Sequence, residues 1–223
     1  MSGKIWRKRR LTGVLILIAF LIFSISLHPS FYQQIPVQDT TERADRAIKD
    51  LHALKVKGRA PKTGYSRKEF GNGWKKQGDC DTRNMILLRD LKKVSVDDNC
   101  KVMAGQLNDP YTGKLILFKR GPDTSDDVQI DHVVALSNAW QTGAQQMSYE
   151  RRIELANDSL ELLAVDGQAN QDKSDGDAAT WLPKNKTFRC QYVARQIQVK
   201  TKYALWLTEP EKAAMVRVLA ACK

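Results

Sequence analysis

The pair Asp131-His132 is the part of the sequence whose residue types most directly suggest chemistry. It lies inside the apolar run 128–136, which reads Val-Gln-Ile-Asp-His-Val-Val-Ala-Leu. A carboxylate beside an imidazole is costly to place in such a run unless both groups are paired or bind a metal. The other histidines, His28 and His52, lie near the N-terminus, so His132 is the leading candidate for imidazole chemistry.

Hydrophobic spacing predicts the elements that must position this pair. Strands are expected over 115–118, 128–136 and 160–165, and helices over 42–54, 82–91, 148–156, 188–207 and 211–221. Segment 109–113, Asp-Pro-Tyr-Thr-Gly, has the composition of a turn. A polar segment opens at Asn170 and is compatible with a short helix. The sequence therefore predicts an α+β domain with few, short strands.

The N-terminal 28 residues differ in kind from the remainder of the chain. A basic cluster between Lys4 and Arg10 precedes the uncharged stretch 11–27, whose length is at the low end of the roughly 17–25 residues that span a bilayer. This pattern indicates a secretory signal or a single membrane anchor. Ser24 and Ser26 form only a weak cleavage site, so both alternatives stay open. Either one makes the remainder extracytoplasmic, secreted or anchored to the membrane by 11–27.

The following residues divide into a tether and a globular domain. Residues 29–63 are expected to form the tether, with a short helix over 42–54 and a basic, Gly- and Pro-containing segment over 55–62. The globular domain is expected over residues 64–223.

The net charge is a mild indication of the partner. The chain has 36 Lys and Arg against 25 Asp and Glu, a formal net charge of +11. The five basic residues of the N-terminal cluster leave 31 against 25 in the exported part. This balance is compatible with a polyanionic partner such as nucleic acid, although many surfaces carry such a charge and bind nothing. No protein partner is inferred.

The cysteines predict disulfides rather than a metal site. All four lie beyond the apolar stretch, at Cys80, Cys100, Cys190 and Cys222. An even number in an exported chain indicates two disulfides, with three pairings possible. We favour Cys80–Cys100 with Cys190–Cys222, because each pair closes a compact unit. Zinc is disfavoured because no Cys-x-x-Cys spacing occurs.

Three segments occur in an order that resembles the HNH, or ββα-metal, endonucleases: Asp131-His132, the predicted strand 160–165 and Asn170-Gln-Asp-Lys173. In that family a strand ends in an acid-histidine or histidine-histidine pair, and a second strand leads to a helix with Asn or His and, three residues on, Lys. Further segments resemble the exported bacterial branch of the family, which is similar to the C-terminal domain of GmrSD-type restriction enzymes: 64–67, 80–84, 109–113, 131–136 with 139–140, and 176–183. The resemblance covers about residues 64–220.

The resemblance implies a ββα-metal core with additional helices, and one divalent cation, expected to be Mg²⁺ with Mn²⁺ as an alternative. It also implies Asp131 and Asn170 as metal ligands and His132 as the general base that activates water. Lys173 is expected to contact phosphate. Because neighbouring strand residues point to opposite faces, Asp131 and His132 converge only if the strand ends or twists at this point.

Glu161 departs from the family pattern, which has an Asn there that helps to fix the histidine loop. A carboxylate at this position either accepts a hydrogen bond from His132 and orients it, or competes for the metal. Arg83 and Arg189 are candidate phosphate contacts, because guanidinium groups bind phosphate in a bidentate manner. Ion pairs with nearby aspartates are the alternative for these arginines.

The residues and the resemblance together predict an exported, metal-dependent HNH endonuclease that hydrolyses DNA, with RNA as a further substrate. No helix stands out that would read base edges, so contacts to the nucleic-acid backbone are expected. The alternative is a catalytically inactive extracytoplasmic domain that binds nucleic acid or another polyanion on the same scaffold. Metal-dependent cleavage separates the two.

Overall fold

Residues 38–222, the part of the chain that this computed structural model describes, form both helices and strands. The predicted signal or anchor and its basic cluster lie outside these residues. Within residues 38–222, no helix is both long enough and apolar enough to span a membrane.

Seven strands in the described chain pair in three antiparallel sheets. The strands are β1 (Lys76–Gln77), β2 (Cys80–Asp81), β3 (Lys92–Val96), β4 (Val102–Asn108), β5 (Leu115–Lys119), β6 (Val128–His132) and β7 (Leu162–Asp166). β1 pairs with β2, and β3, β4 and β5 form a meander in that order. β6 pairs with β7 in a register that joins Val128 to Asp166 and His132 to Leu162.

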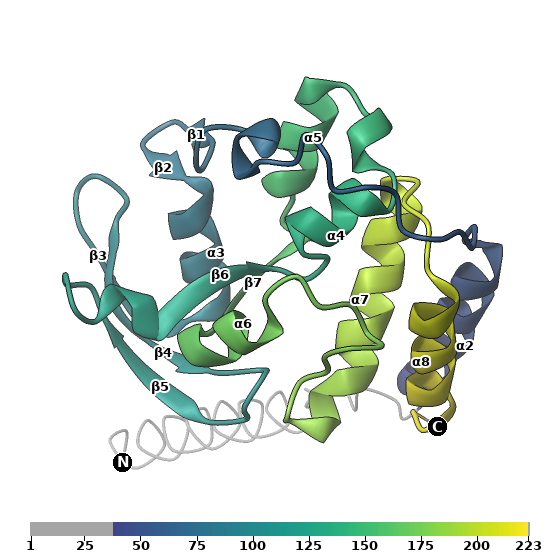
Figure 1. Ribbon diagram of the computed structural model, residues 1–223. Coiled ribbons are helices and arrows are strands. Elements are labelled where there is room, and N and C mark those ends of the chain that lie inside the picture. The colour runs from purple at the N-terminus through teal and green to yellow at the C-terminus, as the bar shows by residue number, and fades with distance from the viewer. Residues whose placement is uncertain (1–37, 223) are drawn as a thin grey trace, which may run out of the picture. The chain divides into compact units, whose positions relative to one another are not determined.

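Seven α-helices lie in the same part of the chain (Figure 1). They are α2 (Gln38–Ala53), α3 (Thr82–Asp90), α4 (Leu136–Gln141), α5 (Tyr149–Ala156), α6 (Gly167–Lys173), α7 (Arg189–Lys202) and α8 (Glu209–Ala220). Side chains cap several helix starts, as polar residues at this position satisfy free backbone N–H groups. Ser148 accepts from the backbone of Arg151, and Thr208 forms a capping box with Glu211. The predicted α+β class is confirmed.

Two predicted elements end earlier than expected. The strand predicted over 128–136 stops at His132, and α4 begins at Leu136. Every residue from Asp131 to Trp140 is buried. The run therefore has no exposed positions, and it is the spacing of such positions that distinguishes a strand from a helix in a sequence. The helix predicted to continue to 207 ends at Lys202. β3 and β4 were not predicted, and irregular pairing interrupts their alternation.

Helix α2, expected in the tether, packs against α7 and α8. Figure 1 shows the three helices together, away from the β3–β4–β5 sheet. Ala44, Ala47 and Leu51 of α2 are buried and recur at helical spacing, which creates one apolar stripe. The compact unit therefore begins at Gln38 and includes this helix.

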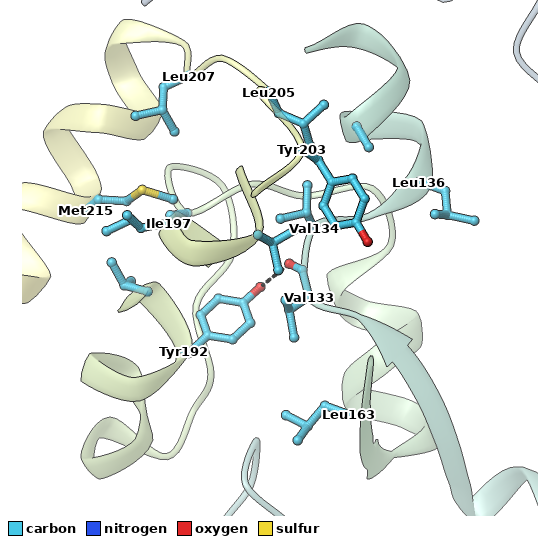
Figure 2. Close-up of a cluster of buried hydrophobic side chains, with 14 of the residues drawn as sticks. Val133, Val134, Leu136, Leu163, Tyr192, Ile197, Tyr203, Leu205, Leu207 and Met215 are labelled. Carbon is cyan, nitrogen blue, oxygen red and sulfur yellow. Dashed lines mark hydrogen bonds between the residues drawn. The ribbon is translucent and has the colours of Figure 1, made fainter. Parts of the chain in front are cut away.

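The β6–β7 strand pair lies between two hydrophobic clusters. Ile130 and Leu162 face the cluster beneath α3 and the β3–β4–β5 sheet, whereas Leu163 and Val165 face the larger cluster with α7 and α8. Figure 2 shows part of the larger cluster, in which the Tyr192 hydroxyl donates to the carbonyl of Val133 over 3.4 Å. Because both faces of this strand pair are buried, each of its polar side chains needs a partner.

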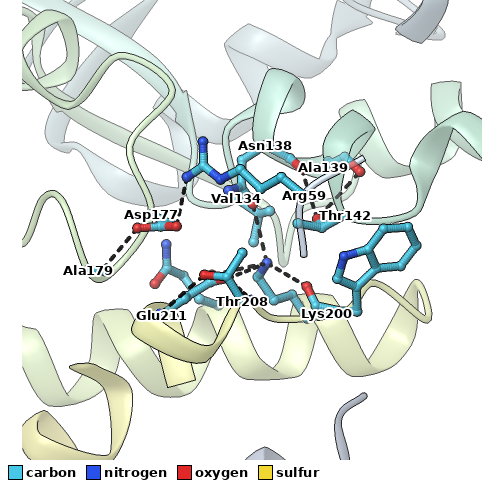
Figure 3. A network of polar contacts seen from close by, with 12 residues as sticks. Arg59, Val134, Asn138, Ala139, Thr142, Asp177, Ala179, Lys200, Thr208 and Glu211 are labelled. Atoms are coloured by element: carbon cyan, nitrogen blue, oxygen red, sulfur yellow. Dashed lines mark hydrogen bonds and ion pairs between the residues drawn. The ribbon is translucent and has the colours of Figure 1, made fainter. Parts of the chain in front are cut away.

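A second buried region is polar and joins the C-terminal helices to the rest of the domain (Figure 3). Lys200 Nζ lies 3.0 Å from Glu211 Oε1, and both side chains are fully buried. Lys200 also donates to Asn138 Oδ1 over 3.2 Å. Nearby, Arg59 pairs with the buried carboxylate of Asp177 at 2.7 Å. The Lys200 contacts connect α7 with α4 and α8, and the Arg59 contact connects the segment after α2 with the loop after α6.

Two disulfides reinforce the fold, and they are the pairing that the spacing favoured. Cys80 bonds to Cys100 and connects β2 to the β3–β4 turn. Cys190 bonds to Cys222 and connects the first turn of α7 to the chain after α8. No cysteine in the described residues is free.

We expect Leu51→Ala to destabilise the whole domain by about 3 kcal/mol, because a fully buried leucine leaves a cavity when it is truncated. Urea unfolding followed by circular dichroism measures the change. Lys49→Ala, an exposed position of the same helix, is the control and should stay within about 0.5 kcal/mol of the wild type. Equal stabilities for Leu51→Ala and the control would show that α2 is not part of the core.

Candidate active site

The candidate site is built on the antiparallel pair β6–β7 and on α6, which begins directly after β7. Asp166 caps α6 by accepting from the backbone of Ala169 over 2.7 Å. The helix packs against both strands. Its side chains meet the face of β6 that carries Gln129 and Asp131, which lie two residues apart and therefore point the same way.

Asp131 has a partner on each of its carboxylate oxygens. Lys173 Nζ lies 2.8 Å from Oδ1, and the Tyr111 hydroxyl donates to Oδ2. Burial and the nearby carboxylate of Asp131 raise the pKa of Tyr111 well above its ordinary value, so the phenol stays protonated and remains a donor. Asp131 is 5% exposed and Lys173 is 1% exposed. The charged pair is thus removed from solvent.

Asn170 lies on the same face, one helical turn before Lys173. Its side-chain nitrogen donates to Gln129 Oε1 over 2.8 Å. The residue is partly exposed. No hydrogen bond joins Asn170 to Asp131 among the described residues, and the two approach the strand at neighbouring positions of one face.

His132 points to the other face of β6. Its Nε2 lies 3.0 Å from the backbone carbonyl oxygen of Ala156 in α5. A carbonyl can only accept, so Nε2 carries the proton and Nδ1 is the unprotonated nitrogen of the neutral ring. Burial and the positive charge of Arg67 lower the pKa of His132 to about 3. The imidazole is therefore neutral, the form that accepts a proton.

Trp74 and Arg67 complete the surroundings of this imidazole. The Trp74 indole stacks on the ring of His132 at 5.7 Å between centroids and 11° between planes. A pocket of about 110 Å³ lies beside the ring, and Arg67 contributes to its wall. Arg67 is exposed, and no carboxylate pairs with it in the part of the chain that the structure describes. Its guanidinium is thus available to an anion.

The wall of this pocket depends on a close approach of two segments. The 3₁₀ turn Arg67–Phe70 ends at Gly71, whose φ of 103° lies in the region that favours glycine. A Cβ added to Gly71 would lie 3.3 Å from Ile153 Cγ1 of α5. The glycine therefore lets the segment that carries Arg67 and Trp74 pass directly over α5, where Ala156 holds His132.

Glu161 supports the chain just after β6. Its backbone carbonyl accepts from Val133 over 2.9 Å and its Oε2 accepts from the backbone of Val134 over 3.2 Å. The side chain is fully buried, and this burial raises the pKa of its carboxyl group well above the usual range. The expected hydrogen bond from His132 to Glu161 is absent, because Ala156 binds the ring instead.

The two arginines expected to contact phosphate both bind backbone carbonyl oxygens. Arg83 donates to Ser125 over 3.2 Å and to Val128 over 3.0 Å. Arg189 donates to Pro183 over 2.8 Å. Neither lines the pocket beside His132. Both hold loops in place, and their binding of phosphate remains a prediction.

The residues around Asp131, as they lie, do not fit a divalent cation. Both oxygens of the carboxylate are engaged, and the ammonium group of Lys173 fills the position beside Oδ1. Residues 38–222 contain no cluster of three or more His, Cys, Asp or Glu side chains that could hold a metal ion. His132 faces away from Asp131, so the arrangement separates the predicted base from the predicted ligands.

Sequence reasoning missed Arg67, Trp74, Tyr111 and Ala156. Arg67 and Tyr111 lie in segments 64–67 and 109–113, whose motifs carried part of the family resemblance without pointing to a role. Trp74 and Ala156 act through a ring face and a backbone carbonyl. Contacts of this kind have no signature in residue type or spacing.

Comparison with known proteins places the chain in a nuclease family. Residues 77–218 match the model for the C-terminal domain of GmrSD restriction endonucleases, and the chain belongs to this family. It is also similar to a protein of Arthroderma benhamiae described as an uncharacterized secreted protein, with 35% identity over 190 residues, 84% of this chain and 90% of that protein. No solved structure matches the chain. The family relates the domain to nucleases, and the disulfides are consistent with an extracytoplasmic location.

We expect Glu161→Gln to be more stable than the wild type at pH 7 and equally stable at pH 4. The folded protein keeps the proton on this buried carboxyl, whereas the unfolded chain releases it above about pH 4.3. Wild-type stability should therefore fall as the pH rises above that value, and glutamine removes this loss. Chemical denaturation at both pH values tests it, with the exposed Glu154→Gln as control. If the stability of Glu161→Gln relative to the wild type were lower at pH 7 than at pH 4, the folded protein would not hold the Glu161 carboxyl in its neutral form.

Proposed function

We propose that the domain hydrolyses phosphodiester bonds of nucleic acid at His132. The substrate we propose is DNA, with RNA as a second polymer to test, and the enzyme acts as an exported endonuclease. One observation carries the proposal: a neutral imidazole lies beside a pocket whose wall holds an exposed arginine that has no carboxylate partner within residues 38–222, in a chain of a nuclease family.

The residues divide the chemical work between them. His132 Nδ1 is the unprotonated nitrogen and accepts the proton of an attacking water. The Ala156 carbonyl keeps its hydrogen bond to Nε2–H when the ring becomes positively charged, and so stabilises that form. Trp74 covers one face of the ring and holds its orientation. Arg67 binds the phosphate and offsets its negative charge.

The divalent cation predicted from the resemblance enters no step of this proposal. Asp131 has no free oxygen for such an ion while Lys173 and Tyr111 are bound to it. Ligation by Asp131 and Asn170 therefore remains a separate prediction, and the cleavage assay below includes chelator and several divalent ions in order to decide it.

The buried ion pair of Asp131 also favours the alternative, a domain that binds nucleic acid without catalysis. The acid that would organise a metal-dependent site is sequestered in a buried ion pair. A domain that has lost its metal would still hold nucleic acid through exposed basic side chains such as Arg67. Such a domain would be retained on DNA in a salt-sensitive manner and would cut it under no condition.

We expect the purified full chain to convert supercoiled plasmid to nicked and linear forms. His132→Ala should lower the rate by at least about 100-fold, the contribution typical of a general base. Arg67→Ala should raise the apparent KM for DNA by about 10-fold, because it removes a charged contact to phosphate. Agarose-gel assays with Mg²⁺, Mn²⁺, Ca²⁺ and EDTA measure both.

The control is Arg217→Ala, which removes an exposed arginine from α8. It should leave the cleavage rate and the KM unchanged. Cleavage by His132→Ala at the wild-type rate would refute the proposed base, and salt-sensitive retention without cleavage would favour the binding domain.

A further inference from the structure

Lys173 is a buried ammonium group at the centre of the β6–β7–α6 unit. Its Nζ lies 2.8 Å from Asp131 Oδ1 and 2.7 Å from the carbonyl oxygen of His132. Its side chain has no exposed surface. One lysine thus neutralises the acid and also holds the backbone of the residue that carries the imidazole.

The other groups around this pair are neutral. Tyr111 fills Oδ2 as a protonated phenol, and Tyr192 is buried beside it. Glu161 lies on the same side of the β6–β7 strand pair, where burial keeps its carboxyl protonated. The region around Asp131 therefore holds one carboxylate and one ammonium group, which balance each other. An additional divalent ion would leave an excess of positive charge in a region shielded from solvent.

Removal of Lys173 from this position would be costly in two ways. Asp131 would become an unpaired buried carboxylate, which proteins avoid unless another cation replaces the lost one. The carbonyl of His132 would lose its donor at the end of β6. An ion that binds Asp131 must therefore first displace a lysine held by two hydrogen bonds.

We infer that Lys173 supplies the positive charge at Asp131, in the position where the family pattern expects a divalent cation. The chain carries its own cation, and a metal ion binds Asp131 only when this lysine is removed. Lys173 is also a positioning residue, since it fixes the strand end from which His132 departs. The inference concerns ion binding and stability, so it stands or fails separately from cleavage.

The test is Mn²⁺ binding to the full chain, measured by the electron paramagnetic resonance signal of free Mn²⁺ and by thermal unfolding. The wild type is compared with Lys173→Met, with the double variant Asp131→Asn/Lys173→Met, and with Lys184→Met. The last removes an exposed lysine whose Nζ lies 3.8 Å from Asp172 Oδ2. The double variant removes both buried charges and serves where Lys173→Met alone fails to fold.

We expect the wild type, Lys184→Met and the double variant to bind Mn²⁺ equally weakly and to gain no thermal stability from it. Lys173→Met should unfold at a lower temperature and should regain stability with Mn²⁺, with an affinity at least about 10-fold above that of the wild type. Tight Mn²⁺ binding by the wild type that the double variant lacks would overturn the inference. So would a folded Lys173→Met protein that binds Mn²⁺ no better than the wild type.

Discussion

The antiparallel pairing of β6 with β7 is the constraint on which the arrangement of the site depends. The pairing continues to His132, opposite Leu162, so Asp131 and His132 are both held in strand geometry and point to opposite faces. Each face is covered by its own hydrophobic cluster. The acid therefore meets α6 and the imidazole meets α5, although the two residues are neighbours in the chain.

Burial on both sides then decides the charge of each group. At Asp131, an ammonium group and a phenol satisfy both oxygens of the side chain. Glu161 has a single backbone donor and no counter-ion in hydrogen-bond contact, so it remains protonated. His132 is neutral because its ring is buried and lies near the positive charge of Arg67, and both effects lower its pKa. Desolvation penalises every buried charge that lacks a partner. Among the groups named here at the β6–β7 strand pair, only Asp131 and Lys173 partner each other as an ion pair.

The pocket beside His132 depends on contacts between segments that are far apart in sequence. Arg67 and Trp74 come from the segment before β1, and Ala156 comes from the last turn of α5. Gly71 lets these two segments approach each other. Because the imidazole is held by a carbonyl and an indole face, its orientation depends on the packing of the domain more than on its neighbours along the strand. This division explains how a nuclease scaffold can keep a buried histidine oriented while Glu161 occupies the position usual for asparagine.

The sequence by itself determined the local features: the Asp131-His132 pair, the helical spacing of Asn170 and Lys173, most helices, and the α+β class. These follow from periodicity and capping, which act over a few residues. Only the tertiary structure decided where the strand at His132 ends and which partner each polar group takes. In a run that is buried throughout, residue type does not reveal which face a side chain meets, or whether the cation beside a carboxylate is a metal ion or a lysine from the next helix. That choice is made by long-range packing.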